Sequence, residues 1–398
     1  MNNINTLIAQ LCPDGVEFRE LGDVCKINRG RVMSKEYIRD NSGNYPVYSS
    51  QTANDGILGK IKSYDYDGEF LTWTTDGANA GSIFYRKGKF SITNVCGLLE
   101  PEKKIISTKF LGYWLDIVAK NYVSAGMGNP KLMSNVMAKI AIPFPPLPIQ
   151  QEIANILDMF TELDAELNAE LEARRKQYEY YRNQLFFVND EGLMINGVKA
   201  ECKALSEIGE FIRGKRFVKN DITSDGIPCI HYGEMYTHYK IWASEAKSYL
   251  EPALAAKLRV AHTGDVIIVA AGETVEDIGN GVAWLGESDV VIHDACFAFS
   301  HNLNPKYVSY FLHTNLFRSQ IKRYISSGKI SSINASGLSK AIIPIPPPAE
   351  QERIVAILDK FDKLVNDISE GLPTEIEARR KQYEYYRGKL LDFKTLVH

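Results

Sequence analysis

An internal repeat limits the fold of this chain more than any other feature of its sequence. The segment Glu172-Ala-Arg-Arg-Lys-Gln-Tyr-Glu-Tyr-Tyr-Arg182 returns letter for letter at 377–387. Upstream of each copy, a proline-rich stretch leads into a similar apolar segment, at 142–160 and at 343–361. Because chance does not produce an identical run of this length, the chain consists of two related halves.

Within each half, the C-terminal part is nearly the same and the N-terminal part has diverged. Weak similarities remain in the N-terminal parts, where 21–31 resembles 205–215 and 109–115 resembles 306–312. The two C-terminal parts are therefore expected to share one function, and the two N-terminal parts to have different functions.

This organisation predicts four parts. A chain of 398 residues exceeds what one hydrophobic core usually supports. We predict a first globular domain over 1–147, a long helix over 148–190, a second globular domain over 191–348 and a second long helix over 349–398. The predicted fold class is α+β, with a pseudo-two-fold internal repeat.

The repeated segments have the apolar spacing of long helices. Steps of three and four residues are typical of a helix that packs along a narrow seam. About 40 residues of helix would extend roughly 60 Å. Two related helices should pack as an antiparallel coiled coil, with one domain at each end. The predicted seam residues are Ile153, Ile156, Phe160, Leu163, Leu167, Tyr178, Tyr181 and Leu185 in the first copy, and Ile354, Ile357, Phe361, Leu364, Ile368, Tyr383, Tyr386 and Leu390 in the second.

The second helix should be interrupted. The two copies are 201 residues apart in the apolar segment but 205 apart in the identical segment, so the second copy holds four additional residues. They lie around Gly371-Leu-Pro-Thr374, and proline lacks the amide hydrogen that a helix interior needs. We expect a break near Leu372, with Pro373 starting the next helical segment.

Short apolar runs alternate with turn signals in both globular domains. In the first domain, we expect strands at 70–75 and 82–85 and a helix at 107–122. Turns are expected at three residue pairs: Asp67-Gly68, Asp76-Gly77 and Lys87-Gly88. In the second domain, 266–269 should be a strand, and Asn304-Pro305 should supply the N-cap and first residue of a helix.

The polar loops of both domains carry groups that can contact bases and phosphates. Arg can donate two hydrogen bonds to guanine, and Asn or Gln can bind adenine in a similar way. Taken singly, each of these residues is more readily explained as a solvated loop residue or a turn former. The candidates are Arg29, Arg31, Ser49, Ser50, Gln51, Thr74, Thr75, Asn79 and Lys131 in the first domain, and Arg213, Lys215, Arg216, Lys219, His231, Tyr232, His238, Lys329, Ser331 and Ser332 in the second.

Two glycine-basic pairs are stronger candidates than the rest. Gly30-Arg31 and Gly214-Lys215 recur at matching places in the two halves. Glycine allows a backbone to approach a phosphate closely. The pairs are therefore expected to contact the DNA backbone.

The tyrosines of the repeated helices have two alternative roles. Packing between the helices would suit Tyr178, Tyr180, Tyr181, Tyr383, Tyr385 and Tyr386, because aromatic residues at helical spacing usually serve burial. Contact with a partner protein is the second role, because Tyr and Arg often anchor interfaces. The candidates for partner contact are Arg174, Arg175, Tyr180, Arg379, Arg380 and Tyr385.

We find no convincing catalytic motif in the sequence. It has no Gly-x-x-x-x-Gly-Lys-Ser/Thr phosphate loop, no complete dinucleotide turn and no His-Glu-x-x-His pair. Its histidines and carboxylates do not follow metal-ligand spacing, and its six scattered cysteines are expected to be reduced and mostly buried. These absences favour a binding component over an enzyme, with no metal site of its own.

The composition agrees with a protein that relies on partners. A formal charge of −3 is not strongly basic, so affinity for DNA would depend on local patches and on other subunits. The start of the chain lacks the features of a signal peptide, and no apolar run is long enough to span a membrane. We expect a cytoplasmic protein with no membrane partner.

These features together resemble the specificity subunits of type I restriction-modification systems. The most specific elements are the proline stretch followed by 150–158 or 351–359, the two identical helical segments, and the Leu-Gly-Asp-Val start at Leu21. The resemblance covers nearly the whole chain. It implies that the two variable domains are target recognition domains, each reading one half of a split, asymmetric site in double-stranded DNA.

The resemblance also implies a division of work among subunits. The helices would set the spacing of the half-sites and dock two methyltransferase subunits, with motor-nuclease subunits joining for cleavage. Those partners would bind S-adenosylmethionine, ATP and magnesium, and this chain would bind no cofactor. The four additional residues near Leu372 break strict two-fold equivalence, so the two partner sites need not be alike there.

Two alternatives stay open at the level of sequence. A specificity subunit of a system with a fused methyltransferase and nuclease would share these domains, and its co-purified partner would distinguish it. A coiled-coil scaffold whose end domains bind protein would share the helices. Loss of DNA protection on changing Arg31 or Lys215 would argue against the scaffold.

Overall fold

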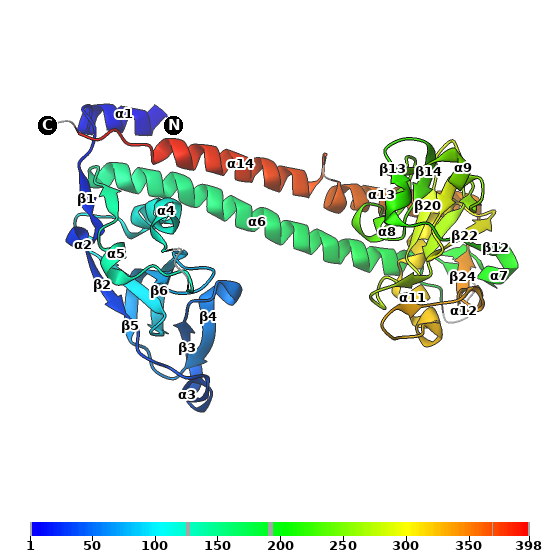
Figure 1. Ribbon diagram of the computed structural model, residues 1–398, viewed down its shortest axis with the longest axis horizontal. Helices are drawn as coiled ribbons and strands as arrows, with labels where there is room; N and C mark the ends of the chain where they lie inside the picture. Colours follow the sequence, from blue (N-terminus) through cyan, green and yellow to red (C-terminus); the bar gives the residue numbers. More distant parts are fainter. Residues whose placement is uncertain (1, 125–127, 190–193, 368, 397–398) are drawn as a thin grey trace. The chain divides into compact units, whose positions relative to one another are not determined.

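The computed structural model describes residues 2–124, 128–189, 194–367 and 369–396 (Figure 1). It divides into two compact units, one formed by 1–166 with 376–398 and the other by 167–375. The long helix α6 (Leu147–Leu185) and the helix α14 (Leu372–Leu390) each contribute to both units. Because this division cuts through both helices, the four-part boundaries stay a prediction.

A mixed sheet forms the body of the first unit. Its strands follow the order β2-β7-β5-β6-β3-β4. Neighbouring strands are antiparallel except β3 and β6, which run parallel. A separate antiparallel pair, β1 with β8, joins a strand that precedes this sheet in the chain to one that follows it. The strands are β1 (Phe18–Glu20), β2 (Cys25–Arg29), β3 (Ser42–Tyr48), β4 (Ile57–Ile61), β5 (Tyr66–Thr74), β6 (Ile83–Ile92), β7 (Cys96–Pro101) and β8 (Ala141–Pro143).

The helix predicted at 107–122 is present. It consists of α4 (Thr108–Val118) and the 3-10 turn η2 (Ala119–Tyr122), and the Ser107 hydroxyl caps it by accepting from the Phe110 N–H. The remaining helical segments of the first domain are α1 (Asn2–Leu11), α2 (Leu21–Val24), α3 (Lys35–Asp40), η1 (Ala53–Gly56) and α5 (Ser134–Met137).

Two of the predicted turns are wrong. Asp67-Gly68 and Lys87-Gly88 lie inside β5 and β6, where Gly68 pairs with Gly88. Both glycines have positive φ angles, 141° and 94°, which side-chain-bearing residues rarely adopt. Gly68 and Gly88 therefore form an unusual cross-strand pair within the sheet and do not reverse the chain. Asp76-Gly77 does lie between β5 and β6, as predicted.

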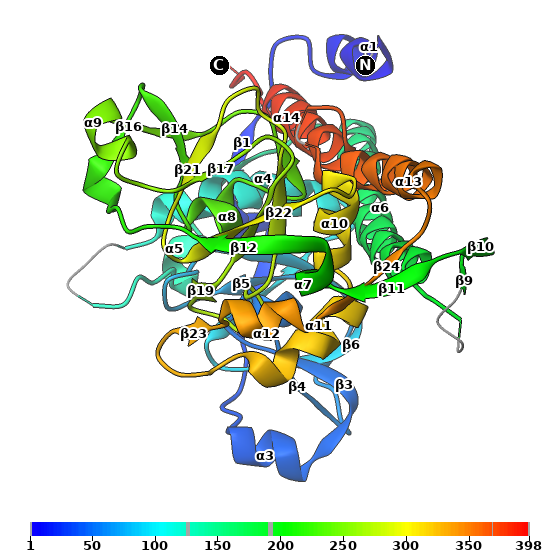
Figure 2. The same cartoon turned by 90° about the vertical axis from the view of Figure 1, so that its right-hand side faces the viewer.

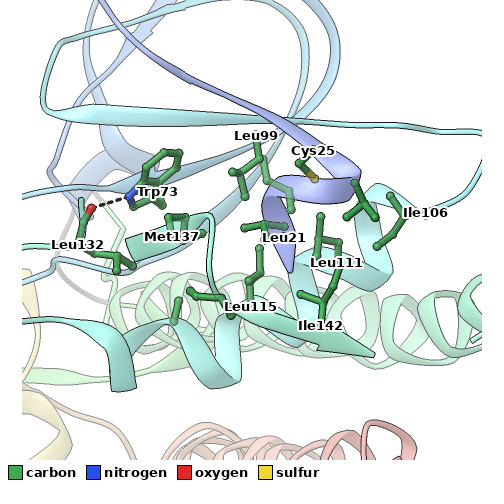
Figure 3. Close-up of a cluster of buried hydrophobic side chains, with 14 residues drawn as sticks. Leu21, Cys25, Trp73, Leu99, Ile106, Leu111, Leu115, Leu132, Met137 and Ile142 are labelled. Carbon is green, nitrogen blue, oxygen red and sulfur yellow. Dashed lines mark hydrogen bonds between the residues drawn. The ribbon is translucent and has the colours of Figure 1, made fainter. Parts of the chain in front are cut away.

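A buried apolar cluster joins the sheet of the first unit to α4 (Figure 3). Trp73 of β5 is fully buried in it, and its indole N–H donates to the carbonyl of Leu132 at 2.9 Å. Gly97 on the neighbouring strand β7 leaves room for this ring, because a Cβ there would lie 2.1 Å from the indole. Burying a satisfied tryptophan removes a large apolar area from water and fixes β5 against β7.

Two five-stranded sheets form the body of the second unit. One has the order β12-β22-β18-β20-β15 and the other the order β13-β16-β14-β21-β17. The strand predicted at 266–269 is β18. The strands of the first sheet are β12 (Gly209–Arg213), β22 (Cys296–His301), β18 (Val266–Val269), β20 (Gly281–Trp284) and β15 (Trp242–Ala243). Those of the second sheet are β13 (Ile222–Thr223), β16 (Ser248–Leu250), β14 (Ile227–Ile230), β21 (Val290–Ile292) and β17 (Val260–Ala261).

Short pairs and helices complete the second unit. Helix α10 (Pro305–Leu312) begins as predicted, because the Asn304 side chain accepts from the Tyr307 N–H at 3.2 Å and Pro305 is its first residue. The strand pairs are β9 (Met194–Ile195) with β10 (Val198–Lys199), β11 (Glu201–Ala204) with β24 (Ile342–Ile345), and β19 (Ala271–Gly272) with β23 (Ser331–Ser332). The other helical segments are α7 (Leu205–Ile208), η3 (Lys219–Asp221), α8 (Glu234–Thr237), α9 (Pro252–Ala255), α11 (Asn315–Ile321), η4 (Lys322–Tyr324) and α12 (Ala335–Ser339).

The two domains share one strand framework. In the first domain, the parallel pair β3 and β6 matches Tyr48 with Ile92; in the second, the parallel pair β14 and β21 matches Ile230 with Ile292. β2 pairs with β7 as β12 pairs with β22. The framework differs in that the single long strand β6 corresponds to two strands, β20 and β21, in the second domain.

The predicted break in the second long helix is present. Helix α13 (Pro348–Asn366) ends there, and α14 begins at Leu372 with Pro373 as its second residue. The Gly371 N–H donates to the Asp367 carbonyl at 3.1 Å, and a Cβ on Gly371 would lie 2.5 Å from that oxygen. The chain can therefore turn so closely against the end of α13 only with glycine at this position.

Within the first unit, α6 and α14 pack antiparallel. The Phe160 ring contacts Tyr383 and Tyr386, with centroid distances of 6.2 and 5.5 Å. One turn further along α6, Asp164 pairs with Arg380 at 2.9 Å. Residue numbers thus rise along one helix as they fall along the other.

Within the second unit, α6 and α13 form the matching contact. The Phe361 ring stacks on Tyr178 and Tyr181, with centroid distances of 6.3 and 5.3 Å. Phe361 corresponds to Phe160, and the two tyrosines correspond to Tyr383 and Tyr386. The same aromatic contact therefore forms in each unit: α6 supplies the phenylalanine in the first unit and the two tyrosines in the second.

The predicted seam is correct in outline and wrong in places. Tyr181 stacks on Phe361 across the seam, as predicted, although it is 39% exposed. Leu364 is 37% exposed, and Leu171 and Val365 are buried without having been predicted. Ile368 lies outside the described residues. A strict three-four spacing therefore does not predict every buried position of these helices.

Each domain is fixed to the helix that follows it by the same contacts. A glutamine near the helix start, Gln150 or Gln351, accepts from the backbone N–H of the N-cap residue of α4 or α10. An aspartate further along accepts from a lysine and a tyrosine of that same domain helix. These sets are Asp158 with Lys109 (2.5 Å) and Tyr113 (2.8 Å), and Asp359 with Lys306 (2.8 Å) and Tyr310 (2.7 Å).

Two further expectations can be compared with the described part of the chain. In it, no helix is long and apolar enough to span a membrane. Most of the cysteines are buried, as expected: Cys25, Cys96, Cys229 and Cys296.

Candidate nucleic-acid interface

Hydrogen bonds join the candidate loops of the first domain into one cluster. Arg29, the last residue of β2, donates to the Asn94 carbonyl at 2.8 Å and to the Thr75 hydroxyl at 3.3 Å. Thr93 donates its hydroxyl proton to Ser49 Oγ at 3.1 Å. The loops that follow β2, β3, β5 and β6 therefore meet at this cluster.

Three further candidates of the first domain form hydrogen bonds or ion pairs with neighbouring loops. Exposed Arg31 lies 3.1 Å from Asp65 and donates to the Tyr37 hydroxyl at 3.3 Å. Gln51 donates to a backbone carbonyl at 2.6 Å, and exposed Asn79 donates to the Thr52 hydroxyl at 3.2 Å. Arg31 and Asn79 are thus both partly engaged and accessible to solvent.

The remaining candidates of the first domain differ in accessibility. Thr74 and Thr75 are buried and hydrogen-bonded within their loop, which favours a role in shaping it over a direct contact with DNA. Ser50 is half-buried. Lys131 is exposed, and its ammonium group lies 3.9 Å from Asp76.

The glycines of the two glycine-basic pairs have a structural reason inside the protein. A Cβ on Gly30 would lie 2.2 Å from the Ile92 carbonyl oxygen, and one on Gly214 would lie 2.2 Å from that of His293. In both places the backbone packs against the neighbouring connection of its own domain. These glycines are therefore required by the framework, whether or not a phosphate comes near.

In the second domain, six of the candidates line one groove of about 870 Å³. Phe217 and His293, which the sequence analysis missed, also line it. Its acidic residues are Glu273 and Asp294. The candidates in the groove are Arg213, Arg216, Lys219, His231, Tyr232 and Lys329.

The other four candidates of the second domain lie outside this groove. Lys215 donates to the Lys257 carbonyl at 2.9 Å, and His238 is exposed at the end of α8. Ser331 is buried in β23, and Ser332 exchanges a hydrogen bond with Ser326 at 2.9 Å. Because β23 pairs with β19, which borders the groove, the two serines support its wall.

Strand register places several candidates of the two domains at equivalent positions. Arg29 and Arg213 end β2 and β12, and each donates through Nε to the carbonyl of residue 94 or 294. Ser49 and His231 each follow the strand that pairs in parallel with β6 or β21. Lys131 matches Ser332, because both bridge the segment that continues β5 or β18.

Residues 93 and 293 form a second equivalent pair that the sequence analysis missed. The Thr93 N–H donates to the Tyr48 carbonyl, and the His293 N–H donates to the Ile230 carbonyl. Both lie three residues before a cysteine, Cys96 or Cys296, which is the one sequence signal that could have found them. In the first domain, residues 49 and 93 are hydroxyl-bearing; in the second, both are histidines.

Part of the candidate partner surface on the long helices is exposed. Tyr180 and Tyr385 occupy equivalent positions and are 59% and 63% exposed. Each contacts the edge of the next tyrosine, which packs on the seam. Of the predicted arginines, Arg174 pairs with Glu170, Arg175 with Glu172 and Arg380 with Asp164, and Arg379 donates to Gln382. Tyr178 is buried, which fits packing between the helices, whereas contact of Tyr180 and Tyr385 with a partner stays a prediction.

Comparison with known proteins identifies the family. The model of the type I restriction modification DNA specificity domain matches residues 13–173 and again 198–378. The chain belongs to the type I restriction-modification specificity subunits. The resemblance seen in its motifs is therefore confirmed.

Some relatives match this specificity subunit along nearly its whole length, and others match less than half of it. A putative type I specificity subunit of Mycoplasma pneumoniae is 31% identical over 374 residues, covering 94% of this chain and 97% of the relative. A putative type I restriction enzyme specificity subunit of Haemophilus influenzae is 32% identical over 413 residues, covering 99% and 100%. The MpnII specificity subunit of M. pneumoniae is 50% identical over 171 residues, covering 42% of this chain and 52% of that protein.

Solved specificity subunits share the fold. The crystal structure of the type I S subunit from M. genitalium aligns with a TM-score of 0.58 at 15% identity, covering 96% of this chain and 97% of that one. A chain from a structural study of type I complex assembly and conformational transition also gives 0.58, at 16% identity, covering 95% and 98%. The predicted fold class, with two α+β domains and two long helices, is confirmed.

Proposed function

We propose that this chain is the non-catalytic subunit that gives a type I restriction-modification complex its DNA sequence specificity. Its two domains read the halves of a split, asymmetric site in double-stranded DNA, and its long helices dock two methyltransferase subunits. Motor-nuclease subunits join for cleavage. The observation that carries the proposal is that one framework, used twice, holds different side chains at equivalent loop positions.

An asymmetric DNA site requires two recognition domains that share a fold but carry different side chains where they contact the bases. The positions after the parallel strands meet this requirement, since Ser49 and Thr93 of the first domain correspond to His231 and His293 of the second. Hydroxyl and imidazole groups present different hydrogen-bond patterns to base edges. The proposal explains why the domains diverged while the helices did not.

Local charge supports DNA as the partner of the second domain. Its groove carries four cationic side chains, Arg213, Arg216, Lys219 and Lys329, against two carboxylates. Contacts with phosphates supply most of the sequence-independent affinity of DNA-binding proteins. A chain with a formal charge of −3 would thus concentrate positive charge where it meets the nucleic acid.

The identical helical segments support two docking sites for one kind of partner. Burial on a seam requires only apolar residues of suitable size, yet exposed residues such as Tyr180 and Tyr385 are also identical in the two copies. Identity of exposed side chains is expected where both copies meet the same surface. Exposed tyrosines with nearby arginines are typical of interface anchors.

The chemistry of the complex would belong to the partners. Methyl transfer requires S-adenosylmethionine, and the motor-nuclease requires ATP and magnesium; this chain would bind none of them. The complex would act on host and incoming DNA in the cytoplasm.

Sequencing of methylated bases in the host, with and without this gene, tests the proposal. We expect a bipartite, asymmetric methylation motif that disappears on deletion and returns on complementation. The purified chain should bind DNA without methylating or cleaving it. An unchanged methylome, or chemistry by the isolated chain, would refute the proposal, and a single co-purified methyltransferase-nuclease would identify the fused system instead.

The docking sites can be tested by native mass spectrometry of the assembled complex. Tyr180→Ala and Tyr385→Ala should each lose one methyltransferase subunit, and the double variant should lose both. Tyr122→Ala, which removes an exposed tyrosine outside the long helices, is the matched control. Full occupancy in the double variant would exclude these tyrosines as anchors.

A further inference from the structure

Four aromatic rings lie together on the wall of the second-domain groove. His231 follows β14 and His293 follows β21, which are parallel neighbours in one sheet (Figure 2). The centroids of the two imidazoles are 4.7 Å apart. Phe217 and Tyr232 lie 5.8 and 4.6 Å from the His231 ring. The His231 ring is therefore held by three others while it stays partly exposed to the groove.

Backbone geometry fixes which nitrogen of His231 carries the proton. The Gly233 N–H donates to Nδ1 at 3.3 Å, so Nδ1 must be the unprotonated nitrogen. In the neutral ring the proton is then on Nε2, for which no hydrogen bond is found within the described residues. Burial lowers the pKa of His231, which favours the neutral ring. The groove thus receives one oriented N–H donor.

His293 has a different position from His231. It is 9% exposed, and its Nδ1 accepts from the Ala295 N–H at 3.1 Å. Its ring meets that of His231 at an angle of 61° and that of Phe217 at 78°. His293 therefore supports the ring of His231 from behind and offers little surface to a ligand.

The groove around His231 is rich in donors. Arg216, Lys219 and Lys329 line it, and their side chains can donate hydrogen bonds but cannot accept them. In the major groove, guanine presents two acceptors, N7 and O6. Adenine presents one acceptor and an amino donor, cytosine only an amino donor, and thymine one acceptor beside a methyl group. Donors that face an amino group would stay unpaired, which costs free energy. Glu273 and Asp294 also line the groove, but its cationic donors outnumber these two carboxylates, so the wall fits guanine, the base with two major-groove acceptors, best.

We infer that His231 reads a guanine in the half-site of the second domain by donating from Nε2 to N7 or O6, and that His293 is the positioning residue that holds its ring. The inference rests on the proposed function and deepens it. At the equivalent position of the first domain, Ser49 carries a hydroxyl that can donate or accept. The two domains would thus read different bases from one place in the framework.

Methylation-motif sequencing of a host that carries the complete system with His231→Ser gives the first test. A lost hydrogen bond to a base should reduce discrimination at one guanine of the second half-site about tenfold. The first half-site should stay unchanged, which controls for folding and assembly. His262→Ser, which changes an exposed histidine of the same domain outside the groove, should leave the whole motif unchanged.

Binding of the purified complex to modified duplexes gives the second test. Replacing that guanine by 7-deazaguanine removes N7, and replacing it by 2-aminopurine removes O6. One of the two analogues should weaken wild-type binding about tenfold and His231→Ser binding less than twofold. His231→Gln, which keeps an N–H donor, should retain part of the discrimination and guards against a folding defect in the serine variant.

The role of His293 is tested at the same guanine. His293→Ala should relax discrimination there and nowhere else, and His293→Phe, which keeps a ring behind His231, should restore it. Equal analogue sensitivity of wild type and His231→Ser would overturn the inference while leaving the proposed function intact. A second half-site without guanine would do the same, whereas a methylome that does not depend on this gene would refute the proposed function itself.

Discussion

In the first domain, Gly30 packs against backbone carbonyls at the end of β6, and in the second domain Gly214 packs in the same way at the end of β21. The preceding arginines, Arg29 and Arg213, reach the same backbone carbonyl position in both domains. One loop away, however, Ser49 is replaced by His231. The comparison teaches that steric demands of the backbone hold the framework constant while adjacent loop side chains remain free to change.

The second domain also differs from the first in the groups that titrate near neutral pH. All seven histidines of the chain follow residue 230, and the first domain has none. Burial lowers the pKa of His301 and of His313 to about 4. The two domains should therefore respond differently to acid although their strands pair alike.

Exchanging the first domain is the strongest way to break the comparison. Replacing residues 1–147 by those of another family member should change one half of the methylation motif completely and leave the other half as it was. The physical reason is that each domain has its own core and its own loops. Methylome sequencing measures the result; a change in both halves would contradict independent reading.

Acid should destabilise the second unit before the first. The folded-state pKa values of His301 and His313 lie below the ordinary value of 6.5, so unfolding takes up protons between pH 6.5 and 4. Stability is complete above about pH 6.5 and falls as the pH drops toward 4, by about 3 kcal/mol for each of the two histidines. His231 and His293, with lowered pKa values, act in the same direction. Exposed His262, with a raised pKa, opposes them weakly.

Hydrogen-deuterium exchange, corrected for intrinsic rates and followed by mass spectrometry, can measure this difference unit by unit. The double variant His301→Gln with His313→Gln should flatten the pH dependence of the second unit. Equal acid sensitivity of the two units would show that carboxylates, not histidines, control it.

Substituting alanine for the equivalent glycines of the two domains tests whether both domains depend on the same close backbone contact. Gly30→Ala and Gly214→Ala would each place a Cβ 2.2 Å from a carbonyl oxygen, so the backbone must shift. Each should lower the free energy of unfolding of its own domain by about 3 kcal/mol. Chemical unfolding curves measure the loss. Gly388→Ala is the control, because a Cβ added there would have no neighbouring atom within 4 Å, and it should be neutral or slightly stabilising. A similar loss of unfolding free energy in Gly388→Ala would contradict the steric explanation.

The contacts between each domain helix and its long helix should give the smallest effect. Asp158→Asn and Asp359→Asn each weaken an ion pair with a lysine, and each should cost about 1–2 kcal/mol of stability. The cost should be similar for the two aspartates, because Lys306 is more buried than Lys109 whereas Asp359 is more exposed than Asp158. Asp40→Asn, which affects an exposed pair with Arg39, is the control and should change little in thermal unfolding.

Local chemistry explains which predictions from sequence succeeded. The cap at Asn304, the strand at 266–269 and the helix break at Pro373 each depend on a few adjacent residues, and all three are present. The predicted turns at Gly68 and Gly88 failed because a glycine with positive φ can also occupy a rung of a strand ladder. The sequence pattern of a turn is the same in both cases.

The candidate site was predicted in part for the same reason. Basic and polar loop residues were recognisable one by one, and six of them do line a single groove. His293 was missed because it reaches His231 only through the pairing of β14 with β21, and Phe217 was missed because its ring meets His231 only in the folded domain. Thr74 and Thr75 were included although they are buried, because nothing in the local sequence reveals that their hydroxyls are satisfied by their own loop.

The sequence by itself determined the duplication, the long helices, the position of the helix break and the family. Each of these can be recognised from short segments that are identical or periodic in the sequence. Only the tertiary structure decided which side chains stand together, since strand pairing brings distant residues into contact. The equivalence of Ser49 with His231, and the tautomer that Gly233 imposes on that histidine, follow from hydrogen bonds that form only once the sheets have assembled.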